Sequence, residues 1–277
     1  MGSDPFFGHF VNGEPGGLDP QDRGLAYGDG LFETMASRDG AIRFIDYHLE
    51  RLAHGCRRLA MPIPDLGPLR NELIARCPPS GQAVVKLVVT RGVGERGYRA
   101  PEPAKLNRIV SVAPWSGYPA EHYTRGVNVE LCALRLAENP QLAGLKHLCR
   151  LEQVLAQMEL GGRSADEGLL RDRSGFVVGG ISSNVFCVRG RRLVTPPLLR
   201  CGVHGVMRRI VLEHAAAAEL EPAEEELTTA QLLESDEVFM TNAVAGIRPV
   251  RVLAGRRFAI GPRTRALMRR LEIASDA

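Results

Sequence analysis

A turn-rich stretch without periodicity, WSGYPAEHYTRG at residues 115–126, divides the chain into two halves that each mix strand and helix patterns. With 277 residues, the chain is long enough for about two domains, taking ~150 residues per domain. Short β-branched runs and amphipathic segments follow one another in both halves, which is typical of the α+β class. We therefore expect an α+β protein with a smaller N-terminal α/β domain at residues 1–117 and a larger C-terminal domain at residues 118–277.

The N-terminal half predicts one sheet with two helices. HFVNGE carries an Asn-Gly turn, a strong hairpin signal, and GLFETMAS and AIRF are strand patterns joined by Arg38-Asp39-Gly40. In IDYHLERLAHGCRRLAM, apolar or bulky residues recur at helical spacing. We expect a second helix at LGPLRNELIARC and two further strands at QAVVKLVVTRG and RIVSVAPW.

The C-terminal half predicts strands at VNVELCALR, EGLLRD, FVVGG, NVFCVRG and EVFMTNA. Helices are expected at GLKHLCRLEQVLAQMEL, with Lys146 near its start, after the loop TPPLLRCGVHG, at EEELTTAQLLESD and at TRALMRRLEI.

Composition excludes several classes of function. The formal net charge of +3, from 35 basic and 32 acidic residues, is too small to indicate nucleic acid or an anionic membrane as partner. No apolar run approaches the ~18 residues of a spanning helix, and no secretory leader is apparent. The six cysteines form no CxxC pair, which predicts reduced thiols in a cytoplasmic protein and no metal site. We expect a small-molecule substrate as partner.

Lysine is rare, so any lysine chemistry has three candidates: Lys86, Lys105 and Lys146. Lys146 follows Asn139-Pro140 at a predicted loop-to-helix junction, where the helix dipole would favour a neutral, nucleophilic amine. The alternative is a solvated surface lysine. Lys86 lies in an apolar strand and is expected to be structural, and Lys105 lies in a Pro-rich loop and is expected to be solvated.

Two segments predict anion binding. In CGVHGVMRR, Gly202 precedes Val203 and His204 at a helix start, where backbone N–H groups without partners form an anion site. The glycine-flexed loop TRGVGERGYR carries Arg91, Arg96 and Tyr98, and arginine binds carboxylates through two hydrogen bonds. The alternatives are an ordinary glycine-led helix start and a solvated loop.

Taken in this order, the segments resemble the class IV aminotransferase family, the fold-type IV pyridoxal-phosphate enzymes, and most closely its bacterial aminodeoxychorismate lyases. The resemblance extends over about residues 10–250. LAGLKHLCRLEQ is its most lyase-like segment and separates the chain from the branched-chain and D-amino-acid transaminases. The other matching segments are DRGLAYGDGLFET, HLERL, TRGVGERGY, SSNVF, TPPLLRCGVHGVMR and the TNA of EVFMTNAVAGIRPV.

The resemblance implies a two-domain fold of the D-amino-acid aminotransferase type, with pyridoxal 5'-phosphate held covalently by Lys146 in the C-terminal domain. Lys146 would also move protons during the reaction, and Arg51 would bind the cofactor phosphate. Arg96 and Tyr98 are candidates for the substrate carboxylate. Sites of this family lie at a dimer interface, so a homodimer is implied. The remaining cofactor-binding residues that the resemblance implies are Gly202, Val203 and His204, through the backbone at the helix start, and Ser182 and Asn242.

One position departs from the family pattern. A glutamate that pairs with the pyridine nitrogen is expected five residues before Asn184, but the chain has Gly179 in FVVGGISSN. Since this glutamate keeps the ring protonated and electron-withdrawing, its loss should weaken carbanion stabilisation. We expect a transaminase to suffer more than a lyase, because the lyase product becomes aromatic.

The resemblance therefore implies a lyase that converts 4-amino-4-deoxychorismate to 4-aminobenzoate and pyruvate, on the route to folate. Lys146 would serve as both covalent anchor and general acid/base. Two alternatives remain open: an amino-acid transaminase of the same fold, and a degenerate cofactor-binding protein, which Gly179 motivates. Retention of Lys146, Arg51 and the GVHG segment argues against the degenerate protein.

Overall fold

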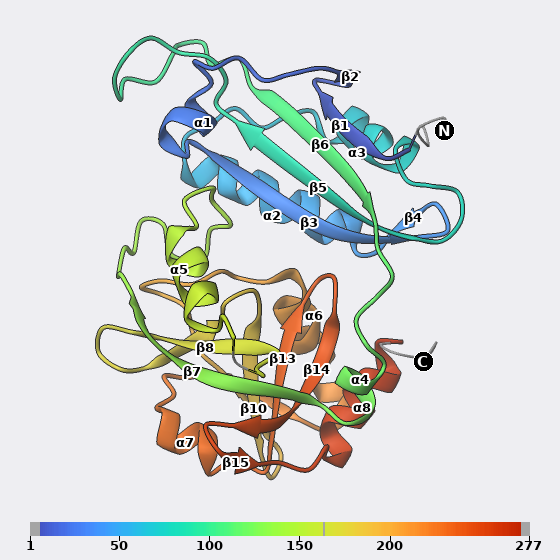
Figure 1. Ribbon diagram of the computed structural model, residues 1–277, viewed down its shortest axis with the longest axis vertical. Helices are drawn as coiled ribbons and strands as arrows, with labels where there is room; N and C mark the ends of the chain where they lie inside the picture. The colour runs from blue at the N-terminus through green and yellow to red at the C-terminus, as the bar shows by residue number, and fades with distance from the viewer. Residues whose placement is uncertain (1–5, 163, 273–277) are drawn as a thin grey trace. The chain divides into compact units, whose positions relative to one another are not determined.

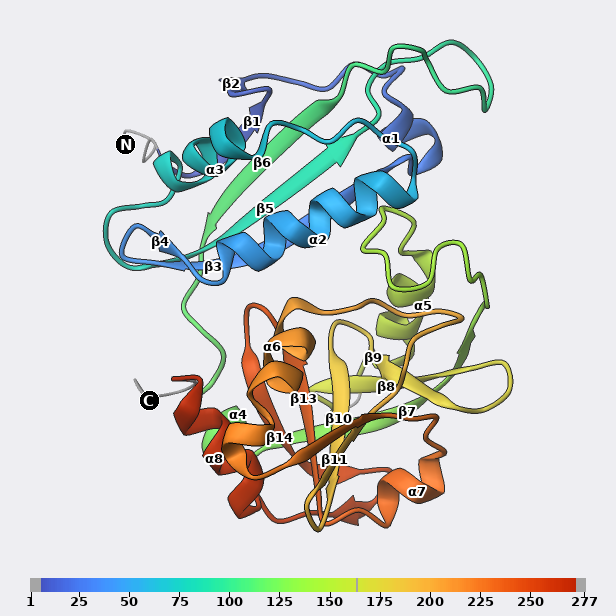
Figure 2. The same ribbon diagram turned by 180° about the vertical axis from the view of Figure 1, so that it is seen from behind.

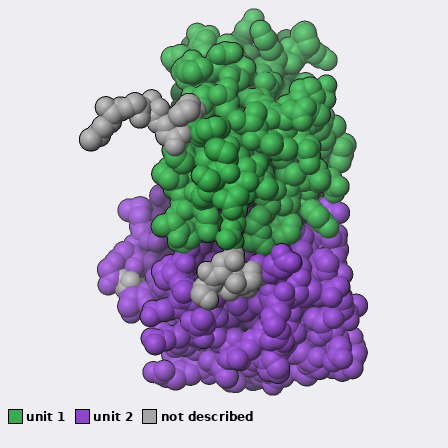
Figure 3. Space-filling model, turned by 90° about the vertical axis from the view of Figure 1, so that its right-hand side faces the viewer, with its two compact units in different colours: residues 1–117, 145–149 green, residues 118–144, 150–277 purple. Residues whose placement is uncertain are grey.

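The computed structural model describes residues 6–162 and 164–272 and contains two compact units. Unit 1 comprises residues 1–117 and 145–149, and unit 2 comprises residues 118–144 and 150–277 (Figure 3). Each unit has its own sheet and its own apolar core. Within the described ranges, no helix is both long and apolar enough to cross a membrane.

Unit 1 is an antiparallel six-stranded sheet in the order β2-β1-β6-β5-β3-β4. Helices α2 and α3 lie on the same face of this sheet (Figures 1 and 2). The opposite face carries no described helix of unit 1. The elements are β1 (Gly8–Val11), β2 (Glu14–Pro15), α1 (Arg23–Tyr27), β3 (Gly30–Arg38), β4 (Ala41–Ile42), α2 (Ile45–Arg58), α3 (Leu66–Ala75), β5 (Gln82–Thr90) and β6 (Asn107–Pro114).

Alternation along β5 explains how the core of unit 1 forms. Val85, Leu87 and Val89 are fully buried and pack beneath the helices, while Lys86 between them is exposed on the other face. Leu49 and Leu52 supply the apolar stripe of α2 that covers this face. Each fully buried aliphatic side chain contributes about 1.5–3 kcal/mol, so both the strand and the helix depend on this packing.

Unit 2 is built on a mixed sheet in the order β12-β11-β10-β13-β14-β7-β8-β9, with β15 paired to β14. Its two apolar clusters join the strands to α5 and to the loop before α6. The elements are α4 (Glu121–Thr124), β7 (Val127–Leu136), α5 (Leu151–Glu159), β8 (Glu167–Asp172), β9 (Val177–Gly180), β10 (Asn184–Arg189), β11 (Arg192–Thr195), α6 (Val206–His214), the 3-10 helix η1 (Ala216–Ala218), β12 (Glu221–Glu224), α7 (Thr229–Leu233), β13 (Glu237–Asn242), β14 (Gly246–Leu253), β15 (Arg256–Arg257) and α8 (Pro262–Arg270).

The segment around Lys146 corrects two predictions. Helix α5 begins at Leu151, so Lys146 lies in an extended segment before it and not at its start. Phe32 N donates to Lys146 O at 3.0 Å, and Leu148 N donates to Gly30 O at 3.1 Å. These backbone bonds pair the segment with β3 and place it in unit 1, whereas the sequence assigned Lys146 to the C-terminal domain.

The helix expected at EEELTTAQLLESD is also shorter than predicted. Glu221–Glu224 forms strand β12, which pairs in parallel with β11. Helix α7 begins only after Thr228, whose side chain accepts from Gln231 N while the Gln231 side chain accepts from Thr228 N. This capping box marks the true start of the helix, and pairing with β11 overrides the helical propensity of the glutamates before it.

Candidate functional site

The predicted site residues fall into two groups, one in each unit. Unit 1 holds Lys146, Arg51, Arg96 and Tyr98, and unit 2 holds Gly202, Val203, His204, Asn242 and Ser182. The geometry of each group is described within its own unit.

The amine of Lys146 lies over an aromatic ring. Its Nζ is 4.0 Å from the ring centre of Phe32, and Lys86 Nζ is 5.4 Å from the same centre. The ring faces of aromatic residues attract cations. Because Lys146 does not lie at a helix start, a helix dipole does not act on its amine. The structure places the amine beside the ring of Phe32 instead.

Arg51 is bound to Glu33, which also contacts His48, and the sequence singled out neither of these two buried residues. Arg51 Nε donates to Glu33 Oε1 at 2.8 Å, and Arg51 Nη2 also contacts Glu33 Oε2. His48 Nδ1 lies 2.6 Å from Glu33 Oε2. His48 and Arg51 are three residues apart on α2 and therefore share one helix face, opposite Glu33 of β3. The spacing of His48 and Arg51 in HLERL, together with the glutamate in LFET, was the only sequence signal for this cluster. The contact itself depends on the packing of α2 against β3.

Glu33, His48 and Arg51 form a triad in which the neighbouring charges oppose the effect of burial on the pKa of Glu33. Burial alone would raise the pKa of Glu33, but the Arg51 guanidinium and the hydrogen bonds from His48 and Arg51 outweigh it and lower the pKa to about 2. Burial lowers the pKa of His48, and its Nε2 is buried without a hydrogen-bond partner. Glu33 is therefore ionised and His48 is neutral at neutral pH, which leaves a carboxylate that fixes the Arg51 guanidinium in place.

The loop at residues 91–99 departs from the prediction at Arg91. Its guanidinium binds Asp29 at 2.8 Å and the carbonyls of Leu59 and Ala60, so Arg91 is structural. Arg23 donates to the carbonyls of residues 97, 98 and 99 and thereby orders the loop. Arg96 is exposed and Tyr98 is 87% exposed, with its ring 5.3 Å from that of Tyr27. The predicted pair thus lies on an ordered, open loop.

In unit 2, the start of α6 presents backbone N–H groups, but not the predicted ones. His204 N donates to Gly144 O at 3.0 Å, so it is already satisfied. Helix α6 begins at Val206 and has no side-chain cap, which leaves the N–H groups of its first turn, at Val206 and Met207, without intrahelical partners. The N–H group of His204 is thus occupied within unit 2, and the anion site expected at Val203 and His204 stays a prediction.

Asn184 fixes the position of this helix start. Its Nδ2 donates to Val203 O at 2.9 Å, and a Cβ at position 205 would lie 2.1 Å from its Oδ1. Only glycine at 205 leaves room for that contact. Asn184 pairs across the sheet with Thr241, whose hydroxyl is fully buried and lacks a hydrogen-bond partner. Next to it, Asn242 Oδ1 accepts from the N–H groups of residues 244 and 245, so this oxygen is used by the turn.

Ser182 is exposed, but its hydroxyl reaches the buried carboxylate of Glu167. Both Ser182 Oγ and Ser183 Oγ donate to Glu167 Oε2, at 3.1 and 2.8 Å. Arg248 Nη2 donates to the same oxygen at 3.1 Å, and both members of this ion pair are 3% exposed. The cluster orders the turn between β9 and β10, which leads directly to Asn184. The hydroxyl of Ser182 therefore donates its hydrogen bond to Glu167.

Gly179 of β9 lies against the backbone of the turn between β9 and β10. A Cβ at this position would lie 2.8 Å from Ser183 O, and Gly180 N donates to this carbonyl at 2.7 Å. We expect Gly179→Glu to lower the unfolding free energy by about 1–3 kcal/mol, because the carbonyl must shift to admit the side chain. Thermal unfolding would measure the effect. Gly67→Glu is the matched control, since its nearest atom would lie 3.6 Å away. Equal unfolding temperatures for the two variants would contradict the steric argument.

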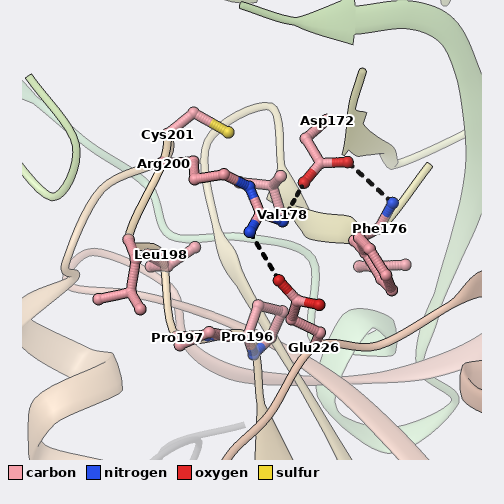
Figure 4. Close-up of a pocket in the computed structure, with 11 residues that line it drawn as sticks. Asp172, Phe176, Val178, Pro196, Pro197, Leu198, Arg200, Cys201 and Glu226 are labelled. Carbon is pink, nitrogen blue, oxygen red and sulfur yellow. Dashed lines mark hydrogen bonds and ion pairs between the residues drawn. The ribbon is translucent and has the colours of Figure 1, made fainter. Parts of the chain in front are cut away.

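A small surface hollow lies in unit 2 between the loop before α6 and β9. Arg200 stands in it and binds Asp172 at 2.9 Å and Glu226 at 2.7 Å (Figure 4). Glu138 lies 3.5 Å from the same guanidinium. Three carboxylates thus surround one cation, so this hollow has the wrong charge for an anionic cofactor.

Comparison with known proteins gives one family. The family model for class IV amino-transferases matches residues 30–253. The crystal structure of 4-amino-4-deoxychorismate lyase from Pseudomonas aeruginosa is 48% identical, has a TM-score of 0.91, and the match covers 95% of this chain and 98% of that chain. An aminodeoxychorismate lyase from Vibrio harveyi is 33% identical over 93% of this chain and 97% of its own length. A putative branched-chain-amino-acid aminotransferase from Methanocaldococcus jannaschii is 32% identical over 90% and 87%.

Proposed function

Because the chain belongs to the class IV aminotransferase family, we propose that it is a pyridoxal-phosphate-dependent lyase that converts 4-amino-4-deoxychorismate to 4-aminobenzoate and pyruvate. The observation that carries this proposal is the similarity to the Pseudomonas lyase over nearly the full length of both chains. The Vibrio lyase supports the same assignment.

The described residues suit the chemistry of this cofactor. Arg51, with its orientation fixed by Glu33, is a cation for the phosphate in unit 1. The uncapped start of α6 and the unpartnered Thr241 hydroxyl are hydrogen-bond donors in unit 2. Lys146 supplies a primary amine, the group that can bind the aldehyde of pyridoxal phosphate covalently. When bound, pyridoxal phosphate supplies an electron-withdrawing ring for the substrate carbon that loses its proton.

Lys146 then carries the proton transfers. Its Nζ accepts the proton from C4 of the substrate and returns a proton to the enolpyruvyl oxygen that leaves the neighbouring carbon. The substrate loses two substituents from adjacent ring carbons, and the ring becomes aromatic. Because aromaticity drives this step, the lyase tolerates Gly179 at the position of the expected glutamate better than a transaminase would.

The experiment that tests the proposal joins a spectrum to an assay. We expect the purified protein with pyridoxal phosphate to show a visible absorbance band that borohydride abolishes, with the adduct mapped to Lys146. Release of 4-aminobenzoate and pyruvate in equal amounts would support the lyase. Transfer of the amino group to a 2-oxo acid without 4-aminobenzoate would support the transaminase named for the Methanocaldococcus relative. A protein that stays colourless with the cofactor would sink both.

The proposal includes a cytoplasmic homodimer. None of the six cysteines forms a disulfide, which suits a reducing compartment. One helix supports self-association: four apolar side chains at helical spacing on α5 are each more than half exposed. Such a stripe is unusual on a surface that stays in water. They are Leu151, Val154, Leu155 and Met158.

We expect Leu155→Glu to dissociate the dimer, because a charge in the middle of this stripe must be desolvated on association. Light scattering after size exclusion should give a mass near 30.2 kDa for the variant and about twice that for the parent chain. Asn71→Glu adds the same charge on exposed α3 and should leave the mass unchanged. A dimeric Leu155→Glu variant would place the interface elsewhere.

A further inference from the structure

The sheet face of unit 1 that carries Phe32 has an unusual character. Antiparallel sheets that are buried on one side are commonly polar on the other. Here the face opposite the core carries five half-buried apolar side chains among polar ones, although no described helix of unit 1 covers it (Figure 1). Its apolar members are Val11, Phe32, Val84, Val88 and Ile109.

One polar row crosses this apolar face. Strand register places Thr34 opposite Lys86, Lys86 opposite Ser111, and Ser111 opposite His9. Directly opposed residues of antiparallel strands project to the same side, so these four side chains share the face with Phe32. His9 Nδ1 lies 2.9 Å from Ser111 Oγ. Lys86 is the only lysine or arginine in the row.

Lys86 has no acidic partner. Among the residues that the structure describes, no carboxylate forms an ion pair with it, and its recorded contact is the ring of Phe32. Most arginines of unit 1, by contrast, are bound to carboxylates or carbonyls, as Arg23, Arg51 and Arg91 are. An ammonium group without an acidic partner is a site that an incoming carboxylate can complete.

From this geometry we infer that Lys86 binds a carboxylate of the substrate and selects for it, an inference that rests on the proposed function. Lys86 Nζ and Lys146 Nζ lie 5.4 and 4.0 Å from one ring centre, so they are no more than about 10 Å apart. The proposed substrate carries its amino group and its ring carboxylate on opposite sides of a six-membered ring. Such a molecule can lie along Phe32, with its amino end toward Lys146 and its carboxylate on Lys86.

This assignment differs from the one suggested by the sequence. Arg96 and Tyr98 were the expected carboxylate ligands, but they lie on an exposed loop, and Tyr98 is 87% exposed. Lys86 is exposed as well, but it shares the ring of Phe32 with the amine of Lys146, and Arg96 and Tyr98 have no such link to this amine.

The first test separates binding from chemistry. We expect Lys86→Met, which keeps the aliphatic stem, to raise KM by about 10- to 100-fold, the loss of one charge-assisted hydrogen bond, and to change kcat much less. Lys86→Arg should recover most of the affinity because it restores the cation. Lys105→Met removes a lysine from an exposed loop and should leave KM unchanged. An unchanged KM for Lys86→Met in an active enzyme would overturn the inference.

The second test does not depend on turnover. Binding to the cofactor-loaded protein is measured by calorimetry for 4-aminobenzoate and for 4-aminobenzamide, which lacks the charge. Lys86→Met should weaken the first by about 10- to 100-fold and leave the second unchanged. Equal weakening of both ligands would indicate a structural role and overturn the inference. If the parent chain releases no 4-aminobenzoate from the substrate, the proposed function fails instead, and that outcome is read from the parent chain alone.

Discussion

Lys146→Ala is expected to abolish the cofactor's reducible absorbance band and to lower kcat by at least about 10³-fold. The substitution removes two functions at once, because the same amine anchors the cofactor and moves the substrate proton. The measurement is turnover at saturating cofactor, with borohydride reduction and peptide mapping of parent and variant side by side. The unfolding temperature of the cofactor-free protein should change little, since the segment is held by backbone bonds to Gly30 and Phe32.

Two controls make this result specific. Lys105→Met should keep the band, the adduct on Lys146 and the turnover. Added methylamine should restore part of the turnover of Lys146→Ala, since a small amine can occupy the space of the missing side chain and accept a proton. A variant that keeps a reducible band with the adduct on Lys86 would contradict the assignment of Lys146.

Local patterns of unit 1 predicted its long strands and its two longer helices, but not the short helix α1. The alternation in QAVVKLVVT predicted β5, and the apolar spacing in IDYHLERLAHGCRRL predicted α2; both form as expected. Asn12-Gly13 and Asp39-Gly40 predicted turns, and all four residues have positive φ. Each of these signals depends on residues that are close in sequence, so it can be interpreted without knowing the rest of the fold.

The predictions that failed depended on distant partners. GLKHLCRLEQVLAQMEL has a continuous helical pattern, yet residues 146–148 pair with β3, more than a hundred positions earlier. His204 N was expected to meet an anion, but it meets Gly144 O. Arg91 donates instead to the carbonyls of Leu59 and Ala60, which directly follow α2. In each case a long-range hydrogen bond outweighs a local preference, which a single sequence does not encode in readable form.

The Glu33–His48–Arg51 triad explains why Arg51 can bind a phosphate and yet not be replaced freely. Glu33 is 2% exposed and its pKa is about 2, so its charge persists whether or not the cofactor is present. Arg51, 15% exposed, is the cation closest to it. The arginine therefore neutralises a buried carboxylate before it meets any ligand, and a substitution at 51 changes the stability and the cofactor affinity together.

A double-substitution cycle is expected to separate these two roles. Arg51→Ala alone should lower the unfolding free energy of the cofactor-free protein by about 3–5 kcal/mol, because it leaves a buried carboxylate unpaired. It should also weaken pyridoxal phosphate binding by at least about 10-fold, the loss of a charge-assisted contact. Arg51→Ala with Glu33→Gln removes the charge as well as the arginine. Chemical denaturation should then show most of the stability restored, while the cofactor affinity stays low.

Pyridoxal without its phosphate is the matched ligand for this cycle. Its affinity should be the same for the parent chain and for the double variant, because Arg51 acts on the phosphate and Lys146 is untouched. If the double variant regains affinity for pyridoxal phosphate, Arg51 serves only to stabilise unit 1. If it loses affinity for pyridoxal to the same degree, the triad shapes the site as a whole and the phosphate assignment is wrong.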